Sequence, residues 1–148
     1  MPEQETIERA REDEREGKSP STQAGEFVGE EMEHIREGKH GATSAKQAIA
    51  IGLSKARRAG VKLPPPKRGS RKVKQQARRE LKKARKHKRP SPKRSRAAKR
   101  RLKREPHSAA SHRALSRQAH RAARRRSAGA RSRSAKKAAR TRAKRKRR

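Results

Sequence analysis

Residues 44–60 read SAKQAIAIGLSKARRAG, and they carry the clearest structural pattern in the chain. Ser44 is followed three residues later by Gln47, the spacing of a capping box, in which two side chains satisfy free backbone N–H groups at a helix start. Small and apolar residues then recur at spacings of three and four, the period of one helix face. Gly60 is placed to end the helix. The pattern predicts a helix over residues 44–59.

A weaker helical stripe precedes this segment, within residues 22–37, and Gly38 follows it as a residue suited to a helix end. Joined through residues 38–43, the two helices are predicted to form an antiparallel hairpin, with Gly52 allowing close approach of the backbones. The apolar residues of the first stripe are Phe27, Val28, Met32 and Ile35.

The rest of the chain is dominated by charge. Among 148 residues, 49 are Lys or Arg and 14 are Asp or Glu, a net charge of +35. Leu, Ile, Val and Phe together number 13, about 9% of the chain, whereas highly charged chains below roughly 20% are usually disordered. The composition therefore predicts a mainly disordered chain with α-helical segments, namely a small all-α helical hairpin and a long basic tail.

The charge is divided into three segments. Residues 1–37 contain twelve acidic and five basic residues, residues 38–63 contain six basic and no acidic residues, and residues 64–148 contain 38 basic and two acidic residues. We predict an acidic, disordered leader at 1–21, a hairpin module at 22–63, and a disordered nucleic-acid-binding tail rich in Lys, Arg and Ala at 64–148. The leader is either a solubility segment or an imitation of nucleic-acid charge that folds back on the tail.

Several classes of function are excluded by composition. The chain has no Cys, Trp or Tyr and one Phe, which argues against Cys-based zinc sites and against aromatic platforms that stack bases. No apolar run approaches the 18 residues of a membrane span, and the polar, acidic N-terminus argues against secretion. Glycine-rich phosphate loops and nucleophile elbows are missing, so no enzyme activity and no cofactor are expected.

Six histidines raise the question of a metal site. No two of them are three or four residues apart, and no carboxylate or thiolate cluster joins them. Solvated or phosphate-facing histidines are the preferred interpretation, and no metal is expected. The six are His34, His40, His87, His107, His112 and His120.

The tail has the properties of a phosphate-binding polycation. DNA carries about one charge per 1.7 Å of axis, and ten neutralised phosphates give a slope of log K against log salt of about −9. The tail has 24 Arg against 14 Lys, and the planar guanidinium suits phosphate oxygens and narrow minor grooves. Alanine- and arginine-rich stretches within it are expected to become helical on binding. No base-reading element is recognisable, so binding should be strong, salt-sensitive and nearly sequence-blind.

The affinity is expected to be spread over many cations, with no single residue decisive. The residues predicted to contact nucleic acid are Lys55, Arg57, Arg58, Lys67, Arg68, Arg71, Lys72, Lys74, Arg78, Arg79, Lys82, Lys83, Arg85, Lys86, Lys93, Arg94, Arg100, Arg101, Arg124, Arg125, Arg126, Lys136, Lys137, Arg145 and Arg147.

Two resemblances bear on function. Residues 64–148 resemble in composition the tails of linker-histone-like nucleoid proteins, and Ser91-Pro92-Lys93-Arg94 is similar to motifs of linker-histone tails, which implies A·T-rich minor grooves. The alternative interpretation of that motif is a proline turn in a basic linker. Residues 46–60, KQAIAIGLSKARRAG, resemble the KQAIAIALSEARRAG signature of small basic bacterial proteins often labelled DNA-binding or plasmid-stabilisation proteins. That resemblance implies a bacterial source.

These observations predict a nucleoid-associated, linker-histone-like protein of the cytoplasm that neutralises and condenses double-stranded DNA. RNA, as in an rRNA-binding protein, is the alternative nucleic acid. A plasmid-stabilisation or antitoxin-like interaction protein is the alternative from another class. No membrane partner is expected. A hairpin of about 40 residues is marginal alone, so homodimerisation through it, or folding on binding, would supply the missing stability.

Overall fold

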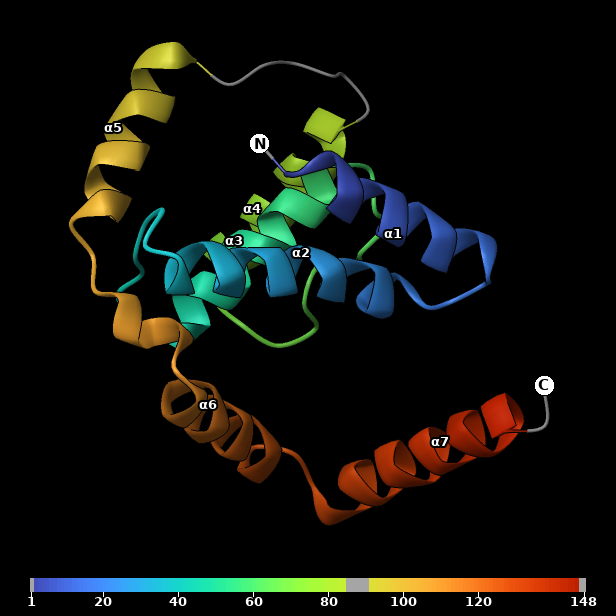
Figure 1. The fold of residues 1–148 in the computed structure, drawn as a ribbon. Coiled ribbons are helices and arrows are strands. Elements are labelled where there is room, and N and C mark those ends of the chain that lie inside the picture. Colours follow the sequence, from blue (N-terminus) through green and yellow to red (C-terminus); the bar gives the residue numbers. More distant parts are fainter. Residues whose placement is uncertain (1, 85–90, 147–148) are drawn as a thin grey trace.

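The computed structural model of the protein describes residues 2–84 and 91–146 (Figure 1). Within those ranges every regular element is a helix and no strand is present. The elements are α1 (Gln4–Arg15), α2 (Pro20–Arg36), α3 (Ala45–Arg58), α4 (Arg71–Ala84), α5 (Pro92–Lys103), the 3₁₀ helix η1 (His107–Ala110), α6 (His112–Arg124) and α7 (Ala128–Lys146). Helices α1 to α4 lie together as a bundle (residues 2–84), and the remaining helices form an arm (residues 91–146) that curves around it (Figure 1).

The prediction of a mainly disordered chain, and with it the description of the protein as intrinsically disordered, is wrong. Residues 1–21 contain α1, and residues 64–148 contain α4 to α7. The composition rule failed because it counts large apolar side chains, whereas alanine builds much of this core. Alanine has the highest helix propensity of all residues, and Arg, Lys and Gln follow closely.

Helices α2 and α3 form the antiparallel hairpin predicted from the sequence. Phe27 in the first half of α2 shares a core cluster with Ala56 near the end of α3. Ile35, near the end of α2, shares the other cluster with Ala48, near the start of α3. Because these contacts run in opposite order along the two helices, the helices are antiparallel.

The start of α3 differs slightly from the predicted capping box. The Ser44 hydroxyl accepts a hydrogen bond from the Gln47 backbone N–H at 3.2 Å, as expected. The Gln47 side-chain oxygen accepts from the backbone N–H of Thr43 at 2.8 Å, one residue before the position predicted by a standard box. The Ser44 and Gln47 side chains thus each accept a hydrogen bond from a backbone N–H group, and α3 begins where the sequence indicates.

The close approach of α2 and α3 depends on Gly52. A Cβ atom added there would lie 2.7 Å from Val28 Cα and 2.9 Å from the Phe27 carbonyl oxygen. These are backbone atoms of the neighbouring helix, which cannot move aside without moving α2. The prediction that Gly52 permits close backbone contact is confirmed.

The buried core consists mainly of alanine. Of the thirteen buried apolar residues in the described ranges, nine are alanine, and the others are Phe27, Met32, Ile35 and Val61. Small side chains let helix axes come close, so many backbone and Cβ atoms make van der Waals contact. The apolar surface of the hairpin is covered by other elements of the same chain. Helices α1 and α4 and the 3₁₀ helix η1 pack directly against α2 or α3.

Helix α1 packs on α2 although it contains a single large apolar residue, Ile7. Thr6, Ala10 and Asp13 are its buried residues, and their spacings of four and three place them on one helix face. Lys18 Nζ lies 2.6 Å from Asp13 Oδ1, which neutralises the buried carboxylate. In the described residues the acidic leader therefore folds onto the bundle.

The arm is attached to the bundle mainly at the loop between α2 and α3, and Arg68 also donates to the Arg125 carbonyl at 3.3 Å. The backbone N–H groups of Gly41 and Ala42, in the loop between α2 and α3, donate to the carbonyls of Leu102 at 2.9 Å and Pro106 at 3.1 Å. In η1, Ala109 and Ala110 are buried in the same core cluster as Met32, Ile35, Ala42 and Ala48. Beyond this attachment α7 continues the arm and lies apart from the bundle, below it in the view of Figure 1.

Across the described residues, no helix combines the length and the apolar character that crossing a lipid bilayer requires.

Candidate nucleic-acid interface

Most of the predicted contact residues lie on the exposed surfaces of α4, of the arm and of the segments beside them. Lys74 is only partly exposed. Arg85, Lys86 and Arg147 lie outside the described residues, and Arg145 lies in α7 with its side chain undescribed. The exposed members are Arg58, Lys67, Arg68, Arg71, Lys72, Arg78, Arg79, Lys82, Lys83, Lys93, Arg94, Arg100, Arg101, Arg124, Arg125, Arg126, Lys136 and Lys137.

Lys55 is committed to the interior of the bundle. Its Nζ lies 2.7 Å from Glu31 Oε2 and 3.1 Å from Glu30 Oε1, and both carboxylates are buried. Burial raises the pKa of Glu30, but the hydrogen bond and charge of Lys55, together with hydrogen bonds from Glu3 N–H and Thr6, outweigh it and hold that pKa below its usual value. The charge of Lys55, whose side chain is 19% exposed, is thus already compensated by two buried carboxylates of α2.

Arg57 is also an interior residue. Its side chain is 9% exposed, its Nη1 lies 3.6 Å from Glu80 Oε2, and its Nε donates to the Leu63 carbonyl at 3.3 Å. Arg58, in contrast, is 55% exposed, although it too approaches Glu80, at 3.8 Å. Of the three cations predicted on α3, only Arg58 is placed at the surface.

Glu80 explains why α4 lies on the bundle. It is one of two acidic residues after position 63, it is 4% exposed, and its carboxylate accepts hydrogen bonds from Gln76 on its own helix and from Ser54 on α3. The only signal in the sequence was an isolated acid within a basic stretch. With Ala77 it fixes one face of α4 against α3 and leaves Arg and Lys on the other face.

The arm concentrates positive charge on exposed helices. Residues 91–146 contain 23 basic residues and a single acid, Glu105. Neither α5 nor α6 buries a residue of its own. Further exposed cations of the arm, which the sequence analysis did not select, are Arg96, Lys99, Lys103, Arg104, Arg113, Arg117, Arg121, Arg131, Arg133, Arg140, Arg142 and Lys144. All Lys and Arg residues of the arm look alike in the sequence, so composition could not indicate which of them are the more exposed.

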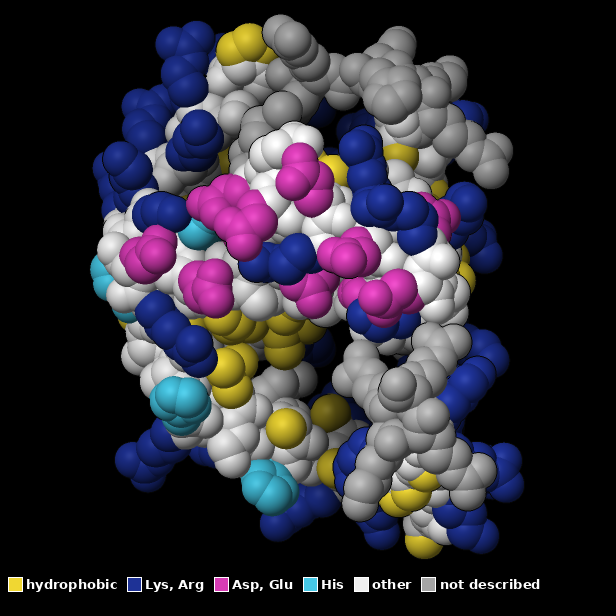
Figure 2. Space-filling view, turned by 45° about the vertical axis from the view of Figure 1, so that its right-hand side comes forward, with side chains coloured by type: hydrophobic (Ala, Val, Ile, Leu, Met, Phe, Trp, Pro, Cys, Tyr) yellow, Lys and Arg dark blue, Asp and Glu magenta, His cyan; other side chains and the backbone are white. Residues whose placement is uncertain are grey.

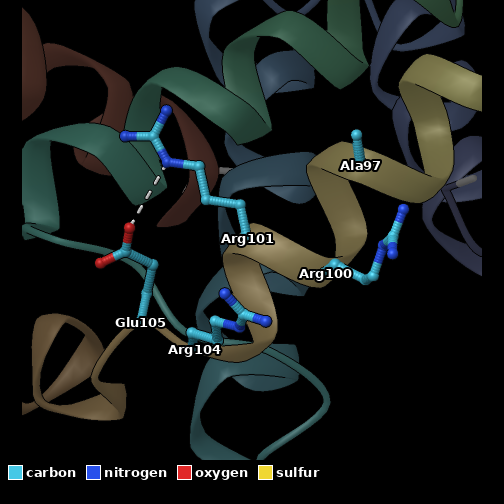
Figure 3. Close-up of a pocket in the computed structure, with 5 residues that line it drawn as sticks. All are labelled: Ala97, Arg100, Arg101, Arg104 and Glu105. Carbon is cyan, nitrogen blue, oxygen red and sulfur yellow. Dashed lines mark ion pairs between the residues drawn. The ribbon is translucent and has the colours of Figure 1, made fainter.

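A shallow hollow of about 500 Å³ lies at the end of α5, lined by Ala97, Arg100, Arg101, Arg104 and Glu105 (Figure 3). Arg101 Nε lies 3.6 Å from Glu105 Oε1, and this ion pair is drawn in the figure. The guanidinium groups of Arg100 and Arg104 point away from that carboxylate (Figure 3). The hollow thus presents more positive than negative charge to an anionic ligand.

The two signs of charge occupy different parts of the surface. Figure 2 shows Asp and Glu side chains gathered in the middle of one face, with a few Lys and Arg side chains between them and many more around the edges. The acidic residues belong mainly to α1, α2 and the residues beside them, because residues 1–37 contain all but two of the chain's acids. A polyanion is therefore repelled from that face and attracted to the arm and α4.

The motif at residues 91–94 begins a helix. Ser91 is the N-cap of α5 and Pro92 occupies its first turn, a position where proline is favoured because its missing N–H would have had no partner. The motif is therefore not a proline turn within an extended linker. Lys93 and Arg94 are exposed in the first turn of the helix.

Comparison with known proteins covers only the hairpin. Residues 19–68 match a family of unknown function, DUF6496. The match contains α2, α3 and the loop between them, and it ends before α4. No curated protein and no solved structure matches the chain. Helix α4 and the arm lie outside this match.

Proposed function

We propose that this protein binds double-stranded DNA without sequence preference, through α4 and the arm, and neutralises and compacts it as a nucleoid-associated protein of the bacterial cytoplasm. The observation that carries this proposal is the 23 basic residues and one acid of the arm, displayed on helices whose surfaces are almost entirely exposed. Since a single carboxylate cannot neutralise these cations, their counter-charge must come from solution or from a bound polyanion.

Helix α7 is long enough to run beside many phosphate groups of a DNA duplex. Helix α7 has 19 residues, which at 1.5 Å per residue gives a length of about 28 Å. Along B-DNA that length passes about 16 phosphate charges, and α7 carries nine basic residues. A helix of this kind can exchange many condensed counterions at once, which gives tight binding at low salt.

Lack of sequence preference follows from the residue types. The arm contains no aromatic residue and no Asn, and Gln118 is its only side-chain amide, so few groups are suited to adenine recognition in a groove. Guanidinium and ammonium groups on exposed helices contact phosphates of any sequence equally well. Shape effects such as narrow A·T minor grooves remain available to Arg.

The test is a titration of the full chain against a random-sequence duplex over a series of KCl concentrations. In one variant, Lys136→Gln and Lys137→Gln remove two exposed cations of α7. In the matched control, Arg11→Gln and Arg15→Gln remove two exposed cations of α1. If both α7 lysines contact phosphates, the salt slope should become shallower by about 1.8, while the control keeps the slope of the unaltered protein.

Equal losses in the two variants would mean that only net charge matters, and the assignment of the arm as the interface would fail. Absence of tight, salt-dependent binding by the full chain would reject the DNA proposal. The same titration with single-stranded and duplex RNA as competitors completes the test, because preferential displacement by RNA would replace DNA with RNA as the partner.

A further inference from the structure

Three potential metal ligands meet at the end of α2. Glu31 and His34 lie one helical turn apart on α2, and His40 lies in the following loop. One ligand atom of each residue lies within 4.8 Å of those of the other two. The expectation that no carboxylate cluster joins the histidines is wrong here, because Glu31 lies three residues before His34 on the same helix.

Glu31 is a buried carboxylate whose oxygens can still accept hydrogen bonds or bind a cation. It is 0% exposed, and neither of its oxygens accepts a hydrogen bond of good geometry. Lys55 Nζ forms an ion pair with Oε2 at 2.7 Å, while Oε1 faces His40 Nε2 at 3.4 Å. Buried carboxylates normally accept several hydrogen bonds, so the Oε1 side of Glu31 requires a positive partner, either a proton on His40 Nε2 or a bound cation.

The outer nitrogens of both histidines already have acceptors. His40 Nδ1 lies 3.2 Å from the Gly41 carbonyl oxygen, and His34 Nε2 lies 2.8 Å from Glu3 Oε1. Since carbonyls and carboxylates only accept, these ring nitrogens carry the protons. In the neutral rings, His34 Nδ1 and His40 Nε2 then offer lone pairs. Such a partner on the far nitrogen is the usual arrangement of metal-binding histidines.

The charges around the cluster also favour a cation. Glu30 and Glu31 are both buried, and Lys55 lies between them as a single positive charge. His34 Nδ1 lies 3.8 Å from Glu30 Oε1, so a second carboxylate adjoins the site. The lone pair of each imidazole faces a carboxylate oxygen, and the two repel each other. A cation bound between them attracts both the imidazole nitrogen and the carboxylate.

We propose that Glu31, His34 and His40 form a binding site for a divalent transition-metal ion of the zinc class. Two imidazoles and one carboxylate form a donor set that suits Zn²⁺, with water in the fourth position. Tetrahedral ligand atoms about 2.1 Å from zinc are about 3.4 Å apart, which equals the distance between Glu31 Oε1 and His40 Nε2. Bound metal would join α2 to the loop that holds the arm, because His40 precedes Gly41, whose N–H donates to Leu102.

The test is calorimetric titration of ZnCl₂ into chelator-treated full-length protein, with Co²⁺ absorption as a second readout of histidine ligation. We expect one ion per chain. The variants His40→Gln and His34→Gln should each weaken binding by at least tenfold and remove the Co²⁺ bands. The matched control is His120→Gln, which alters an exposed histidine of α6 and should leave both readouts unchanged.

His40 is the more informative variant because it lies in a loop, so its replacement leaves the helices intact, as circular dichroism would verify. If the unaltered protein does not bind Zn²⁺ stoichiometrically, or if His40→Gln and His120→Gln bind it equally well, the site is refuted. DNA is not present in these titrations, so failure here leaves the proposed DNA binding unaffected, and failure of DNA binding leaves the metal site unaffected.

Discussion

The carboxylate of Glu80 on α4 lies 3.6 Å from the guanidinium of Arg57 on α3, and both side chains are almost completely buried. One partner belongs to the hairpin and the other to a helix in which nearly every other charged residue is basic. Together with buried Ala77 and the hydrogen bond from Ser54, this pair holds a strongly basic helix against α3.

The first prediction concerns this pair. Replacing Glu80→Gln keeps the size of the side chain but leaves the charge of Arg57 buried and uncompensated, which should cost about 3 kcal/mol of unfolding free energy. Chemical denaturation of the full chain measures the loss, and faster proteolysis at residues 64–70 should reveal release of α4. The control Glu12→Gln alters an exposed acid of α1 and should be nearly neutral. Equal stability of the two variants would contradict a structural role for the pair.

The second prediction concerns helix packing at Gly52. In Gly52→Ala the new methyl group would overlap the α2 backbone at Val28, and overpacking of this kind costs about 1–3 kcal/mol. Gly29→Ala is the matched control, because a Cβ there meets nothing within 4 Å, and alanine should add up to about 1 kcal/mol through helix propensity. The two substitutions should therefore shift Tm in opposite directions. A stabilising Gly52→Ala would disprove the close approach.

The third prediction concerns the attachment of the arm. A Cβ at Gly41 would lie 1.8 Å from the Glu105 carbonyl oxygen and 2.8 Å from that of Pro106. Gly41→Ala should therefore push residues 102–106 away from the loop while the bundle stays folded. Hydrogen exchange measures this directly, since the amides of residues 41 and 42 donate to the arm and should exchange faster in the variant. Unchanged protection of these two amides would show that the arm is not held there.

The fourth prediction concerns acid stability. The pKa of Glu30 is lowered from 4.5, because attraction by Lys55 and hydrogen bonds from Glu3 N–H and Thr6 outweigh burial. A lowered folded-state pKa stabilises the protein above the unfolded pKa, and the contribution disappears as pH falls through the folded pKa. Glu30→Gln should therefore be less stable at neutral pH and should lose less stability below about pH 4.5.

Denaturation curves at several pH values measure this effect of Glu30. His34 and Glu31 also face this region, so the comparison should be made with Glu33→Gln, which alters an exposed acid on the same helix. Parallel pH profiles for the two variants would contradict the assignment to Glu30.

The hairpin was predictable because its signals are local. The serine cap, the spacing from Ala45 to Ala56 and the glycine after α3 act within one or two helical turns, so the backbone responds to them wherever the helix packs. The close approach of α2 and α3 could also be anticipated, since Gly52 is the residue that lets two backbones meet. The segregation of acidic and basic residues is likewise a property of the sequence alone.

Tertiary structure decided which of these charges are available. Lys55 and Arg57 look in the sequence like any other basic residues, but buried Glu30, Glu31 and Glu80 neutralise them inside the bundle. Packing also decided that an alanine-rich chain folds, because close contacts between small residues depend on partners distant in sequence, such as Ala48 and Ala110. The meeting of Glu31, His34 and His40 is of the same kind: a loop must fold back before the third ligand reaches the other two.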